Sequence, residues 1–173
     1  AESRKGNPDH ARELLAQLST NKVLKSEVDL EAAHTFIAEK NWPKAIQHYR
    51  SWLNKADNEK APQRAKVTFD LGWLYSLNLK TKEAHDTFSM LIVAFSSTPE
   101  ASRAQMWVAD YYFNLGGDHL VRAEEAYQKV RDMKNCPLEL KHRSTLLAGR
   151  SALARRNFAN ARDYFNELTK EKN

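Results

Sequence analysis

The same short pattern occurs four times along this chain: an alanine is followed four residues later by an aromatic residue. The four pairs are Ala45–Tyr49, Ala84–Phe88, Ala123–Tyr127 and Ala161–Phe165. Their alanines are 39, 39 and 38 residues apart. Four residues is just over one turn of an α-helix, so each pair lies on one helix face. A pattern that recurs at this interval predicts a stack of similar helical units, and it constrains the fold more than any other feature of the sequence.

A small residue precedes each of these alanines, in the part of the repeat where another helix is expected. The four small residues are Ala33, Gly72, Ala109 and Gly149. Small side chains on adjacent helices let the two backbones approach closely, and the aromatic residue then fills the space between helix pairs. Each repeat is therefore predicted to be a pair of antiparallel helices.

Helical spacing of apolar residues extends over most of the chain, and strand alternation is absent. The predicted helices span about 8–19, 26–40, 42–55, 61–79, 81–95, 99–115, 118–133, 137–155 and 157–170. All five prolines stand where one of these helices should begin, because a missing N–H costs no hydrogen bond in the first turn. Five glycines and five prolines are too few for a turn-rich all-β domain. The predicted fold class is all-α.

The four concordant helix pairs resemble the tetratricopeptide repeat (TPR) family over about residues 26–170. The resemblance implies a right-handed α-α superhelical solenoid, with repeats at about 26–60, 61–98, 99–136 and 137–170 in a single domain of residues 26–173. Residues 1–25 would form an N-terminal segment that holds a leading half-repeat, because Ala11 lies 34 residues before Ala45. We therefore expect the chain to be a segment of a longer solenoid.

The interval between repeats is longer than the 34 residues of the family consensus. The segment Phe95–Ala101, with the sequence FSSTPEA, resembles the links between repeats in a long-period bacterial subgroup. Similar repeats occur in periplasmic coordinators of the Tol-Pal system and in lipoproteins of outer-membrane barrel assembly. The resemblance implies a bacterial protein of the periplasm or cell envelope.

The sequence contains no recognised catalytic or cofactor-binding motif. It has neither a phosphate-cradling glycine loop nor a His-Glu-x-x-His segment. The single cysteine, Cys136, excludes an internal disulfide and a multi-cysteine zinc site. The acidic groups Glu124–Glu125 and Glu27/Asp29/Glu31 are adjacent or two residues apart, which is typical of solvated helix surface. We predict no enzymatic activity, no cofactor and no metal site.

The TPR resemblance implies that the first helices of the repeats line a concave groove. The residues predicted to bind a ligand there are Lys66, Phe69, Trp73, Arg103, Asp110, Phe113, Arg143 and Arg150. Lysine and arginine can hold carboxylates, and aromatic side chains supply much of the affinity of binding surfaces. The predicted partner is a peptide or protein segment with acidic and apolar residues. Packing between adjacent helices is the favoured alternative for four groove residues, namely Phe69, Met106, Phe113 and Leu146.

Two other partner classes stay open. The net charge is +5, and residues 137–173 carry eight basic against four acidic residues, which would suit nucleic acid. No recognised nucleic-acid motif supports that alternative. The other alternative is a structural module that self-associates through its open ends. A membrane span is not expected, because no apolar run approaches about 18 residues.

Overall fold

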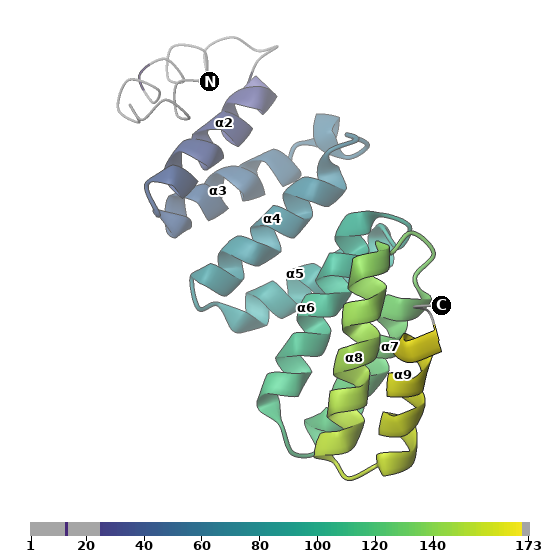
Figure 1. Ribbon diagram of the computed structural model, residues 1–173. Helices are drawn as coiled ribbons and strands as arrows, with labels where there is room; N and C mark the ends of the chain where they lie inside the picture. The colour runs from purple at the N-terminus through teal and green to yellow at the C-terminus, as the bar shows by residue number, and fades with distance from the viewer. Residues whose placement is uncertain (1–12, 14–24, 171–173) are drawn as a thin grey trace. The chain divides into compact units, whose positions relative to one another are not determined.

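The structure is a computed structural model that describes Glu13 and residues 25–170. Over these residues the chain forms eight α-helices, one 3-10 helix and no strand (Figure 1). The helices are α2 (Lys25–Ala38), α3 (Trp42–Leu53), η2 (Ala56–Asn58), α4 (Arg64–Leu77), α5 (Thr81–Ala94), α6 (Pro99–Leu115), α7 (His119–Asp132), α8 (Leu138–Ala154) and α9 (Phe158–Lys170). The prediction of an all-helical chain is confirmed. The predicted half-repeat at 8–19 lies, apart from Glu13, outside the described residues.

The chain divides into two compact units, Ala1–Thr87 and Phe88–Asn173. The first unit contains α2, α3, α4 and the beginning of α5. The second contains the rest of α5 and the four helices α6 to α9. The predicted arrangement of all repeats in a single domain stays a prediction.

In the first unit, α2 packs against α3 and α3 packs against α4. In the second unit, α6 packs against α7, α7 against α8 and α8 against α9, while α6 also contacts α8. The helix pairs α2–α3, α6–α7 and α8–α9 therefore pack as the predicted antiparallel pairs, each joined by a short turn (Figure 1). The pairing of α6 with α8 places the first helices of two successive repeats side by side.

The repeated alanines lie in the core, as their spacing predicts. Ala45, Ala84 and Ala123 are 0% exposed and Ala161 is 3% exposed. The small residues of the first helices are buried as well, namely Ala33, Gly72, Ala109 and Gly149. Burial of both sets follows from the helix-pair packing, because each small residue leaves room for atoms of the neighbouring helix.

Two prolines open their helices as expected. Pro43 lies in the first turn of α3, and Pro99 begins α6. Before Pro99, the Thr98 side chain accepts a hydrogen bond from the Ala101 N–H at 3.3 Å, as a capping residue does. The other two described prolines lie outside the helices that they precede, since Pro62 comes two residues before α4 and Pro137 is the capping residue of α8.

The turn inside a repeat has the same backbone conformation in three repeats. Lys40, Leu79 and Arg156 have left-handed backbones, with φ of 57°, 57° and 62°. The N–H of the following residue then donates to a carbonyl five residues earlier, the 6→1 hydrogen bond of a Schellman helix end. These bonds join Asn41 to Phe36 (2.8 Å), Lys80 to Tyr75 (2.9 Å) and Asn157 to Ala152 (2.8 Å). The remaining described turn of this kind uses Gly116 and Gly117.

Candidate peptide-binding surface

One face of α8 carries an exposed row in which arginine and leucine alternate. The row consists of Arg143, Leu146, Arg150 and Leu153, and all four residues are exposed. Leu146 is 43% and Leu153 is 48% exposed. Residues three, seven and ten positions apart share one side of a helix. We call this row the α8 row; it offers cations and apolar side chains to the same space.

The side of α6 next to α8 supplies a carboxylate that holds two neighbours. Asp110 accepts a hydrogen bond from the Tyr127 hydroxyl at 2.6 Å. Its second carboxylate oxygen lies 3.9 Å from Nη2 of Arg143. The ring of Phe113 lies edge-on to that of Tyr127, with 6.4 Å between the ring centroids. The structure thus brings together three of the predicted residues, Asp110, Phe113 and Arg143, around Tyr127.

Tyr127 was not among the predicted site residues, but the predicted residue Arg150 lies close enough to affect the pKa of its hydroxyl. Burial raises the pKa of the Tyr127 hydroxyl, and its bond to Asp110 raises it further, while Arg143 and Arg150 act in the opposite direction. The hydroxyl therefore stays protonated and donates to Asp110 at any physiological pH. The sequence shows Tyr127 only as the aromatic residue of a repeat, and no sequence signal reveals the bond that its hydroxyl makes.

Two of the predicted arginines keep their charge available. Arg103 and Arg150 are exposed, and neither forms an ion pair with any residue that the structure describes. Arg143 is paired only at the 3.9 Å distance to Asp110, and its side chain is 62% exposed. These guanidinium groups can accept a carboxylate from a ligand without giving up a strong internal pair.

The predicted residues of α4 lie in the first unit. Trp73 is 48% exposed, and Phe69 is partly buried. Lys66 donates a hydrogen bond to Asp70 at 2.6 Å, one helical turn away, so part of its charge is offset within the helix. The i,i+4 spacing of Lys66 and Asp70 is a sequence signal from which this pair could have been predicted. That these residues share a groove with those of α6 and α8 stays a prediction.

The prediction that Glu124 is a solvated surface residue is wrong. It is 4% exposed, and its carboxylate accepts hydrogen bonds from Arg155 Nε (2.8 Å), Asn160 Nδ2 (2.9 Å) and the Tyr164 hydroxyl (3.1 Å). Arg155 Nη2 lies 2.7 Å from the same carboxylate. These partners come from α9 and the end of α8, so Glu124 joins three helices. A carboxylate saturated by internal donors has a structural role.

Asp29 is a second acidic residue with internal partners. Its carboxylate contacts His48 Nδ1 at 3.2 Å, the Ser51 hydroxyl at 3.1 Å and Lys55 Nζ at 2.5 Å. All three partners lie on or just after α3, so the cluster fastens α2 to α3. His48 and Ser51 each contact Asp29 rather than one another, so the three groups do not form the serine–histidine arrangement of a nucleophile and its base.

Further reactive groups are Cys136 and the possible metal ligands among residues 25–170. Burial raises the pKa of the Cys136 thiol, which leaves little thiolate to act as a nucleophile. In the part of the chain that the structure describes, no three histidine, cysteine or acidic residues are grouped so that they could hold a metal ion. None of the described helices combines the length and the apolar character that crossing a bilayer requires.

Comparison with known families matches residues 118–173 to the tetratricopeptide repeat model. The match begins at Asp118, directly before α7, and covers α7, α8 with its exposed row, and α9. No curated protein resembles the chain closely enough to count as a match. The family comparison thus supports the TPR resemblance over the last third of the chain, and it does not confirm the resemblance to the bacterial envelope subgroup.

Solved structures extend the likeness over nearly the whole chain. The MamA crystal structure matches with a TM-score of 0.70 at 18% identity, over 98% of this chain and 91% of that one. BtubC (BKLC) from P. vanneervenii matches with a TM-score of 0.70 at 13% identity, over 98% and 73%. A putative kinesin light chain from Podosopora anserina, with nearly identical TPR-like repeats, matches with a TM-score of 0.64 at 18% identity, over 97% and 88%. At these identities the likeness establishes a shared fold.

Proposed function

We propose that this TPR-type helical array is a non-enzymatic scaffold that binds a peptide or protein segment carrying acidic and apolar residues. Arrays of this fold typically hold protein partners rather than carry out chemistry. The observation that carries the proposal is the α8 row, in which two exposed leucines alternate with two arginines that lack a strong internal partner. Exposed apolar side chains arranged in one row favour a partner over solvent.

The spacing of the α8 row suggests which segment would fit. Arg143 and Arg150 are seven residues apart, which corresponds to about 10 Å along a helix. In a polyproline II segment, which has three residues per turn, residues three apart share one side and are separated by about 9 Å. A segment with two acidic residues three positions apart could therefore contact both arginines, while an apolar residue between them covers Leu146. The Tyr127–Asp110 bond would hold Arg143 in place for this contact.

Peptide display against the purified chain tests this proposal. We expect selected peptides to carry paired acidic residues with an apolar residue between them. They should lose binding to an Arg143→Glu/Arg150→Glu variant, by about 2 kcal/mol or more for two lost charge-assisted contacts. Lys129→Glu/Arg162→Glu is the matched control, because it makes the same charge change at two exposed residues outside the row. Peptides that bind both variants equally would move the site to another surface.

Nucleic acid is a second candidate partner, favoured by the exposed Arg103, Arg143 and Arg150. The two ligands respond differently to salt. Binding to phosphates weakens steeply as salt is raised, because counterions are released, whereas a peptide anchored by apolar contacts weakens far less. Titration of a single-stranded oligonucleotide at two salt concentrations, beside a selected peptide, separates these alternatives.

A location in the bacterial cell envelope is also proposed, on the strength of the long repeat interval and the FSSTPEA link alone. Fractionation of cells of the source organism, with detection of the chain by antibody, tests it. Recovery in the periplasmic or membrane fraction would support this location, and recovery with cytoplasmic markers would contradict it.

A further inference from the structure

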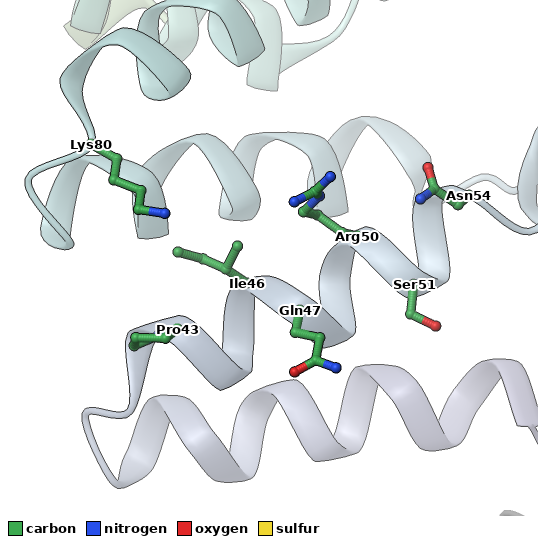
Figure 2. Close-up of a pocket in the computed structure, with 7 residues that line it drawn as sticks. All are labelled: Pro43, Ile46, Gln47, Arg50, Ser51, Asn54 and Lys80. Atoms are coloured by element: carbon green, nitrogen blue, oxygen red, sulfur yellow. The ribbon is translucent and has the colours of Figure 1, made fainter.

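A concave surface lies in the first unit. An open cavity of about 350 Å³ is bordered by α3 and by the turn that leads into α5 (Figure 2). Its lining residues are Pro43, Ile46, Gln47, Arg50, Ser51, Asn54 and Lys80. Two of the seven are cations and none is acidic. We call this cavity the α3 cavity.

The two cations of the α3 cavity face the same space. Figure 2 shows the ends of Arg50, on α3, and Lys80, in the turn before α5, directed toward each other above Ile46. Neither forms an ion pair within the described part of the chain. Two like charges that share a hollow repel each other, and a bound anion would convert this repulsion into attraction. The charge pattern therefore favours an anionic ligand.

The rest of the lining indicates which anion would fit. A guanidinium group can donate two parallel hydrogen bonds to an oxoanion, and an ammonium group contacts a further oxygen as a point charge. The amide of Asn54 can add a neutral donor, whereas the Gln47 amide is directed away from Arg50 and Lys80 (Figure 2). The Ser51 hydroxyl already donates its hydrogen bond to Asp29, so it adds no donor for a ligand. Tetrahedral phosphate, with several oxygens to satisfy, suits such a set of donors.

The apolar residues point to more than a bare ion. Pro43 and Ile46 form a carbon surface beside the cations. The volume also falls in the range of cavities that hold small organic ligands. A phosphate that carries an organic group could place its oxygens on Arg50 and Lys80 and its carbon atoms on Ile46.

We propose that the α3 cavity is a binding site for a phosphate monoester, with Arg50 and Lys80 as the residues that hold the phosphate. This site shares no residue with the proposed peptide surface. Either proposal can therefore fail without the other.

The test is an NMR titration of the full chain in a buffer free of phosphate and sulfate, at constant ionic strength. The probes are O-phosphoserine, inorganic phosphate and unmodified serine. We expect O-phosphoserine to shift amide signals around Gln47, Asn54 and Lys80, to bind more tightly than inorganic phosphate, and serine to have no effect. Equal affinity for the two phosphates would overturn the assignment to a monoester.

Three variants locate the site. Arg50→Gln and Lys80→Gln should each weaken O-phosphoserine binding about tenfold, the order expected for loss of one charge-assisted hydrogen bond. Lys60→Gln is the control, since it removes one exposed charge of the same unit outside the cavity. Equal weakening in all three variants, or signal shifts spread over the whole surface, would overturn the site. Lys80 lies in an exposed turn, so its variant should fold even if Arg50→Gln does not.

Discussion

Gly149 on α8 lies so close to the ring of Phe165 on α9 that a β-carbon at position 149 would stand 2.5 Å from Cε1 of that ring. Phe165 is the aromatic residue of the fourth Ala–aromatic pair, and Gly149 is the small residue of the same repeat. Two features recognised separately in the sequence therefore face each other across one helix pair. The close approach predicted at Gly149 is present, but it is made to the side chain of Phe165 within the same helix pair rather than to a neighbouring backbone.

Replacing Gly149 by alanine should destabilise the second unit despite the higher helix propensity of alanine. Propensity favours alanine by about 1 kcal/mol, but displacement of a packed ring costs about 1–3 kcal/mol. We expect a net loss of about 1 kcal/mol in the free energy of unfolding, measured in urea. In a Phe165→Leu background the same substitution should be neutral or stabilising. A rise in stability in the wild-type background would contradict the argument.

Arg155→Met should be strongly destabilising, because it leaves the buried carboxylate of Glu124 without its cation. We expect a loss of about 3 kcal/mol, at the lower end for a broken buried pair since Asn160 and Tyr164 still donate to Glu124. Thermal unfolding followed by circular dichroism measures it. Arg162→Met serves as the control, because the Arg162 side chain is 74% exposed and its loss should change little. Equal effects of the two substitutions would show that the Glu124 cluster adds no stability.

The stability of the first unit should depend on pH, because the carboxyl group of Asp29 titrates differently in the folded and unfolded states. Burial acts to raise the pKa of Asp29, but hydrogen bonds from Lys55, His48 and Ser51 outweigh it and lower the pKa below the ordinary value of 3.8. A carboxyl whose pKa is lower in the folded state stabilises the fold above the unfolded value. That contribution is lost as the pH falls through the folded value.

Asp29→Asn should therefore lower the melting temperature at neutral pH, and the difference from wild type should shrink as the pH falls below 3.8. Melting curves over a range of pH measure this convergence. Asp57→Asn, at an exposed residue of the same unit, should have a small effect throughout. A difference that stays constant with pH would mean that Asp29 acts through packing rather than through its charge.

Leu79→Gly should stabilise the chain. Leu79 is 88% exposed and has a φ of 57°, a conformation that costs a leucine about 1 kcal/mol and a glycine nothing. Since no buried contact is lost, we expect a gain of about 0.5–1 kcal/mol in the free energy of unfolding. Leu77→Gly, at the last residue of α4 and 43% exposed, should instead lose up to about 1 kcal/mol. A loss at position 79 as well would show that the Leu79 side chain makes a stabilising contact.

The helices and their packing could be predicted because the signals are local and repeated. Ala123 and Tyr127, for example, are four residues apart on α7, and both are 0% exposed. The TPR resemblance placed Arg143 and Arg150 on the open side of α8, and both are exposed, as is Leu146 between them. Met106 occupies the corresponding place on α6, yet it is 4% exposed. Its α6 helix contacts both α7 and α8, and this burial is set by neighbours that the spacing does not show.

The polar network could not be predicted, because its partners are distant in sequence. Glu124 meets Arg155 and Tyr164, which are 31 and 40 residues away, and nothing in a run of two glutamates shows which one is buried. The bond from Tyr127 to Asp110 likewise depends on how α6 and α7 are rotated against each other. Such pairings follow from the packed structure, whereas the i,i+4 pair of Lys66 and Asp70 was accessible from spacing alone.

The turn at Lys40, Leu79 and Arg156 has the same conformation in three repeats, although the side chain at this position differs. A basic, an aliphatic and another basic side chain occupy the same backbone conformation, closed each time by the same main-chain bond. This turn position accepts different side chains while the backbone around it keeps the same conformation. Substitutions at positions 40, 79 and 156 can therefore change the chemistry of the exposed surface of each of these repeats without changing the geometry of its turn.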